Sequence, residues 1–127
     1  MYFVFTAWIT LAALLMYAMI TMKVSFARKQ YEVKAPSVDG PPAFLRVMRV
    51  QINTVEQLVW FLPALWLCAL CLSDLAAAFG GILWLIGRTI YALQYYRDAA
   101  KRGFGFTLSI VATILLMLGA AGGLIFY

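Results

Sequence analysis

The chain consists of long apolar stretches separated by short polar ones, and this pattern predicts its helices. Four stretches each contain about 20 or more largely apolar residues, the length that a helix needs to cross the hydrocarbon core of a bilayer. These predicted spans cover approximately residues 2–22, 43–72, 75–96 and 104–127. Because they use up the chain, we expect a single transmembrane domain, 1–127, with no room for a soluble one.

The composition agrees with this pattern. Apolar residues make up 65% of the chain and charged residues 12%, whereas soluble domains have roughly 45–50% and about 25%. The sequence therefore indicates an all-α integral membrane protein. The first stretch has no basic residue ahead of it and is longer than the core of a secretory signal, so we expect a retained span.

The polar links predict how the helices are connected. The first link, about residues 30–42, is long, and its prolines and glycine stop helices. The other two links are short, so neighbouring helices should pack antiparallel in an up-down bundle of four. Basic residues surround the first and third links and are missing from the second. By the positive-inside rule, we expect the first and third loops to be cytoplasmic, and the positive charge then needs no nucleic-acid partner.

Small residues inside the predicted spans indicate close helix packing. Gly80-Gly81 lies in the third span and Gly119-x-x-x-Gly123 in the fourth. Cys68 and Cys71 have the C-x-x-C spacing of redox sites, but no strand-to-helix context accompanies them. We interpret both cysteines as small apolar packing residues.

Two polar stripes interrupt the second and third predicted spans. Ionisable groups at membrane depth are costly unless they are paired or face a wet cavity, so they indicate a functional site. Positions three, four and seven apart share one face of a helix. The first stripe comprises Arg46, Arg49, Asn53, Glu56 and Trp60, and the second comprises Arg88, Tyr91, Tyr95, Asp98 and Arg102. We expect the two stripes to enclose a hydrophilic pocket at the cytoplasmic end of the bundle.

The residue types in these stripes suggest the chemistry of a ligand. Guanidinium groups hold carboxylates in planar forks, while Glu56 and Asn53 suit an ammonium or an amide. Polar contacts that only hold helices together need fewer polar residues than this. The set therefore favours the binding of a small, highly charged ligand. With no histidine in the chain, imidazole general bases are excluded, and the scattered acidic residues do not favour a metal site. Lys23, Lys34, Arg46 and Lys101, taken singly, are better explained by anionic lipid headgroups.

The order and spacing of these residues resemble the MAPEG family, membrane-associated proteins in eicosanoid and glutathione metabolism. The resemblance rests on Arg49-x-Gln51-x-Asn53-x-x-Glu56 in the second span, on Arg88-x-x-Tyr91-x-x-x-Tyr95-x-Arg97-x-x-x-x-Arg102 at the end of the third, and on Gly40-Pro41-Pro42-x-Phe44-x-Arg46 before the first motif. It covers nearly the whole chain. The most similar branch is that of cysteinyl-leukotriene synthase and the related microsomal glutathione transferases.

The resemblance implies a homotrimer with one glutathione in each subunit interface, near the cytoplasmic face. Arg102 matches the arginine that the family places beside the glutathione sulfur, which makes it the expected catalytic residue. The glutathione-binding residues implied in the same way are Arg28, Arg49, Gln51, Asn53, Glu56, Arg88, Tyr91 and Tyr95. The expected function is a microsomal-type glutathione transferase for detoxification, with glutathione as co-substrate, a lipophilic electrophile that enters from the bilayer, and a further peroxidase activity.

The chemistry agrees with these residue types. A thiol with an unperturbed pKa near 8.5 is only a few per cent thiolate at neutral pH, and a nearby guanidinium lowers that pKa. Two residues depart from the leukotriene-synthase branch. Gln57 stands where that branch has a tyrosine, and Lys29 stands where it has a second arginine, whose planar fork lysine does not reproduce. These differences favour general thiol transfer over leukotriene synthesis.

Two other functions stay open from the sequence. One is a non-catalytic, lipid-binding scaffold of the same family, against which the presence of Arg102 argues. The other is a small four-helix multidrug exporter, which needs a carboxylate in its first span, whereas residues 2–22 contain none. The bacterial inner membrane and the endoplasmic reticulum are both open as locations, with the compact loops slightly favouring the bacterial membrane.

Overall fold

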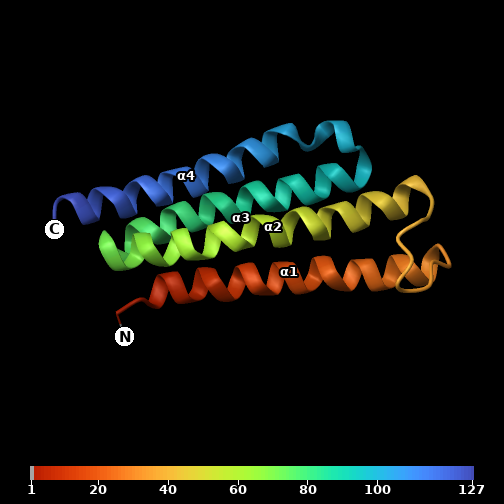
Figure 1. Ribbon diagram of the computed structural model, residues 1–127, viewed down its shortest axis with the longest axis horizontal. Coiled ribbons are helices and arrows are strands. Elements are labelled where there is room, and N and C mark those ends of the chain that lie inside the picture. Colours follow the sequence, from red (N-terminus) through yellow and green to blue (C-terminus); the bar gives the residue numbers. More distant parts are fainter. Residues whose placement is uncertain (1) are drawn as a thin grey trace.

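The protein is a bundle of four long helices arranged up and down, as seen in a computed structural model that describes residues 2–127 (Figure 1). The helices are α1 (Val4–Gln30), α2 (Pro42–Cys71), α3 (Asp74–Arg97) and α4 (Gly103–Ile125), and a short 3₁₀ turn, η1 (Ala99–Arg102), precedes α4. All four are long and apolar enough to cross a membrane. The predicted class is confirmed: this is an all-α, multi-pass integral membrane protein.

The helix α1 differs most from its predicted span. It continues to Gln30, whereas the span was expected to end near residue 22. The additional turns are rich in polar residues, which form helix outside the hydrocarbon as readily as inside it. The helix ends where Glu32 takes a left-handed φ of 55° and the Val33 N–H donates to the Arg28 carbonyl at 3.0 Å, an arrangement typical of helix C-termini.

The helices α2 and α3 form the centre of the bundle, and α1 and α4 pack on opposite sides of them (Figure 1). Phe61 from α2 and Trp84 from α3 are fully buried and stack with ring centroids 3.9 Å apart. Cys68 is buried in the same apolar cluster, as predicted for a packing residue. This core fixes α2 against α3, the two helices that carry most of the polar stripes.

Single polar side chains tie the helices together at both ends of the bundle. The Asp74 carboxylate accepts hydrogen bonds from the Phe5 N–H at 3.0 Å, the Thr6 N–H at 2.8 Å and the Thr6 hydroxyl at 2.6 Å. Asp74 therefore caps the first turn of α1 from the start of α3, where a carboxylate is favoured. At the opposite end, Arg46 Nε donates to the Tyr96 carbonyl in the last turn of α3 at 3.0 Å.

Glycines set the distance between α3 and α4. A Cβ on Gly87 would lie 2.8 Å from the Ser109 backbone nitrogen, and a Cβ on Gly105 would collide with the backbone of Tyr91. The sequence pattern predicted close packing at Gly80-Gly81 and at Gly119-x-x-x-Gly123 instead. Gly80 does lie against α4, Gly81 lies against α1 and α2, and Gly119 and Gly123 lie against the end of α2. The pair Gly87 and Gly105 was not predicted, although these two residues bring the start of α4 against the polar end of α3.

We expect Gly105→Ala to lower stability, because a methyl group there meets fixed backbone rather than a movable side chain. Overpacking of this kind costs about 1–3 kcal/mol, so the thermal unfolding midpoint in detergent should fall. Gly103→Ala is the matched control, since a Cβ on Gly103 meets nothing within 4 Å. Equal midpoints for the two variants would contradict the close approach of α3 and α4.

Candidate functional site

A small polar pocket lies between α2, α3 and the start of α4. Its lining residues are Asn53, Glu56, Gln57, Arg88, Tyr91, Arg102 and Phe106. Asn53 and Glu56 of the first predicted stripe therefore meet Arg88, Tyr91 and Arg102 of the second, whereas the other residues of the two stripes do not line the pocket. The volume is about 150 Å³, whereas pockets that enclose a small-molecule ligand measure roughly 300–1,000 Å³. One chain by itself can therefore surround only part of such a ligand.

Arg88 is the buried cation of this pocket, with 1% of its surface exposed. Its Nη2 donates to the Thr54 hydroxyl at 3.2 Å, and its guanidinium carbon lies 3.9 Å from the centre of the Tyr91 ring. Its Nε and Nη1 are buried and have no hydrogen-bond partner within residues 2–127. Unsatisfied donors on a buried charge are costly. Arg88 thus keeps two donors free for an anionic group.

Tyr91 connects the two stripes. Asn53 Nδ2 donates to the Tyr91 hydroxyl oxygen at 2.6 Å, which links α2 to α3 across the pocket. The Tyr91 ring contacts both the Arg88 guanidinium and the Tyr95 ring, whose centroid lies 5.4 Å away. A phenol that accepts one hydrogen bond still has its own proton to donate. Tyr91 can therefore donate to a ligand while its orientation is fixed.

Arg102 reaches the pocket by a route that the sequence did not predict. Helical spacing placed Asp98 and Arg102 on one stripe with Arg88, and this was wrong. The helix α3 ends at Arg97, and Asp98 is extended, with φ −160° and ψ 118°. Asp98 instead accepts a hydrogen bond from the Ala100 N–H at 3.0 Å and starts η1, while Arg102 Nη1 donates to the Ala99 carbonyl at 2.8 Å. The turn folds the exposed Arg102 back over the pocket.

Four of the predicted ligand-binding residues lie outside this pocket. Arg28 donates to the Ser37 carbonyl at 2.7 Å and so holds the first loop at the end of α1. Arg49 is exposed on α2, and Gln51 and Tyr95 are partly buried. None of the four lines the pocket of a single chain. A single chain therefore brings together four of the eight predicted ligand-binding residues, Asn53, Glu56, Arg88 and Tyr91, and leaves the other four outside the pocket.

Three residues of the site were not predicted to belong to it. Gln57 lines the pocket and accepts a hydrogen bond from Trp60 Nε1 at 2.9 Å, although the sequence marked it only as a departure from the family. Phe106 adds the apolar wall, and its position four residues after Arg102 could have indicated this. Thr54 accepts a hydrogen bond from Arg88. No sequence signal could have identified it, because a single threonine in an apolar span is common.

The charges of the lining give the pocket a preference for anions. Two guanidinium groups, of Arg88 and Arg102, face one carboxylate, that of Glu56. Arg88 is buried, so water screens its charge less than it screens the charges of the exposed Arg102 and Glu56. A ligand with more negative than positive groups is favoured.

Comparison with known proteins identifies the family of the chain. The MAPEG family matches residues 5–122, which include the pocket and parts of all four helices. An uncharacterized protein of Synechocystis sp. is 44% identical over 90% of this chain and 83% of its own length. Leukotriene C4 synthase of Mus musculus is 36% identical over 94% of this chain and 79% of its own length. Microsomal glutathione S-transferase 2 of Homo sapiens is 37% identical over 80% of this chain and 69% of its own length. The chain therefore belongs to the MAPEG family, as its motifs indicated.

Proposed function

We propose that this protein is a membrane-bound glutathione transferase, which holds glutathione as a thiolate and directs it at lipophilic electrophiles. The observation that carries the proposal is Arg88, a buried arginine with two free donors in a pocket whose rim carries Arg102. Relatives named as a glutathione S-transferase and a leukotriene C4 synthase support it. Peroxide reduction by the same thiolate is part of the proposal.

The charged groups of glutathione suit the polar pocket. The tripeptide has two carboxylates, one ammonium group and a thiol. Arg88 offers Nε and Nη1 to one carboxylate, which would relieve the cost of burying these donors. Glu56 suits the ammonium, and the Tyr91 hydroxyl, fixed by Asn53, has a proton for a further oxygen.

The reaction needs no nucleophile from the protein. The thiol loses its proton to solvent at the exposed rim, where the Arg102 guanidinium stabilises the thiolate. The sulfur then forms a bond to an electrophilic carbon, and the displaced group leaves with the electron pair of the broken bond. Phe106, one turn after Arg102, provides an apolar wall beside the sulfur for the lipophilic partner.

We infer that the working form is a homotrimer, with both glutathione and the electrophile bound between subunits. The pocket of about 150 Å³ is too small for the whole tripeptide. Arg28, Arg49, Gln51 and Tyr95 would contribute to the rest of the binding site once a neighbouring copy is in place.

The first and third loops would face the cytoplasm, the source of the soluble co-substrate. A bacterial inner membrane is the favoured location.

Glutathione binding and conjugation by the full chain in detergent test this proposal. We expect saturable binding of glutathione in equilibrium dialysis and its transfer to a lipophilic aryl halide. Glu56→Gln should weaken binding at least about tenfold, since a hydrogen-bonded ion pair is lost. A glutathione analogue without the amino group is the control, because it should bind both proteins equally. No binding of glutathione by the wild type would refute the proposal and favour the non-catalytic scaffold.

A further inference from the structure

We propose that a groove between α1 and α3 binds one anionic phospholipid, with its headgroup at Lys23 and an acyl chain along the two helices. This groove, called here the α1–α3 groove, consists of two adjoining cavities of about 460 and 480 Å³, which share Met19, Lys23 and Tyr96. The 460 Å³ cavity is also lined by Ala43 and Val47 of α2. Among the described residues, none lines both this groove and the polar pocket. The inference therefore does not depend on the proposed reaction.

The groove changes from apolar to polar along its length. The cavity farther from the first loop is lined mostly by aliphatic and methionine side chains of α1 and α3, among them Leu15, Met16, Ile20 and Leu93. The cavity nearer the first loop adds the polar groups of Gln30 and Tyr31. Lys23 lies where the two cavities meet. This gradient matches an amphiphile with its chain toward the membrane centre.

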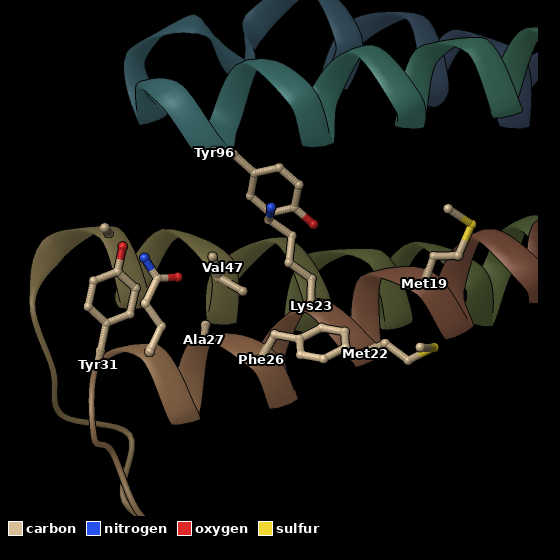
Figure 2. A pocket seen from close by; sticks show the side chains of 10 residues that line it. Met19, Met22, Lys23, Phe26, Ala27, Tyr31, Val47 and Tyr96 are labelled. Carbon is tan, nitrogen blue, oxygen red and sulfur yellow. The ribbon is translucent and has the colours of Figure 1, made fainter.

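Lys23 and Tyr96 lie where the two cavities of the groove meet (Figure 2). The Lys23 ammonium lies 4.5 Å from the centre of the Tyr96 ring, which reaches across from α3 toward α1. The Tyr96 hydroxyl is buried and has no hydrogen-bond partner in residues 2–127. Arg46 fixes the Tyr96 backbone through its carbonyl. An ammonium and a phenol with donors to spare suit the oxygens of a phosphate diester.

The charge around the groove points to an anion. In the part of the chain that the structure describes, no acidic side chain lines either cavity. Lys23 is also the first charged residue from the start of α1. Its apolar stem lines both cavities together with Met19, while its ammonium lies over the Tyr96 ring, as expected of a lysine at the membrane interface. A negatively charged headgroup is the complement of this end.

The surrounding membrane contains the molecule that we propose for the α1–α3 groove. The groove opens beside exposed apolar side chains of two spans, including Leu15, Met19 and Leu93, so its apolar half faces hydrocarbon rather than water. Lipid chains are the apolar molecules available at that depth, and anionic lipids are attracted to basic residues at the surface. The acyl chain of a phospholipid with one negative charge matches the apolar half of the groove, and its headgroup matches the basic half.

Native mass spectrometry of the full chain in detergent tests the charge requirement. Phosphatidylglycerol and phosphatidylcholine with identical acyl chains are titrated separately. We expect a preference for phosphatidylglycerol, which Lys23→Gln reduces about fivefold without changing the binding of phosphatidylcholine. Lys34→Gln is the matched control, an exposed lysine of the first loop outside the groove. Equal binding of the two lipids, or no effect of Lys23→Gln, would overturn the proposal.

A second pair of variants tests where the chain binds. Ala12→Phe fills the apolar cavity, whereas Ala18 is exposed on α1 outside the groove, so Ala18→Phe is its control. Only Ala12→Phe should abolish binding of phosphatidylglycerol. If it changes the oligomeric mass and leaves lipid binding intact, a second copy of the chain occupies the groove and the proposal fails. It fails equally if glycerol phosphate, which has no acyl chain, competes as well as the lipid.

Discussion

Arg102→Ala is expected to return the pKa of bound glutathione to that of an ordinary thiol, about 8.5, and to slow conjugation at neutral pH about a hundredfold. The thiolate is the charged form, so a guanidinium beside it lowers the thiol pKa and extends the thiolate to lower pH. The wild-type rate should therefore reach its plateau at lower pH than the rate of the variant. The difference between them should shrink as the pH rises above 8.5.

Thiolate absorbance in the ultraviolet measures this directly, in detergent and with glutathione at saturation. Arg102→Lys keeps a positive charge without the planar fork, so its midpoint should lie between the other two. Lys101→Gln is the control, because Lys101 is the adjacent exposed cation of η1 and does not line the pocket. An Arg102→Ala protein with the wild-type midpoint would show that another group stabilises the thiolate.

Arg88→Met is expected to weaken glutathione binding at least about a hundredfold while leaving the unfolding midpoint of the free protein unchanged or raised. In the free protein, Nε and Nη1 of Arg88 are buried without partners, so removing them relieves a cost. In the complex, the same donors would hold a carboxylate, so their removal loses charge-assisted hydrogen bonds. Thr54 is not left unpaired, since its hydroxyl donates to the Val50 carbonyl at 2.6 Å.

Calorimetric titration with glutathione and thermal unfolding without it separate these two effects. Arg97→Met is the matched control, an exposed arginine at the end of α3 that does not line the pocket. It should change neither measurement. If Arg88→Met lowered the unfolding midpoint of the free protein strongly, Arg88 would be part of the framework rather than a ligand-binding residue.

The close approach of α3 and α4 brings Arg88 and Arg102 to the same pocket. Arg88 follows Gly87, and Arg102 precedes the turn of α4 that contains Gly105. Because both glycines lie against backbone of the opposite helix, the main chain sets the distance between the backbone positions from which the two arginine side chains extend. The same contact explains why Gly105→Ala is expected to impair stability, and it predicts that Gly105→Ala also weakens glutathione binding.

The sequence by itself determined the four membrane helices and the meeting of Asn53, Glu56, Arg88 and Tyr91. Helix length depends on the run of apolar residues, and a shared face depends on a period of 3.6 residues, so both are local properties that a linear pattern contains. Family motifs in addition pointed to Arg102.

Only the tertiary structure decided how Arg102 reaches the pocket, that Arg28 is held by the first loop, and that Thr54 supports Arg88. Helical periodicity ends where the helix ends, at Arg97, and beyond that point the direction of a side chain depends on the turn. The partner of a polar group depends on which helices are neighbours and how closely they pack. These are contacts between residues distant in the sequence, and a pattern along one chain does not contain them.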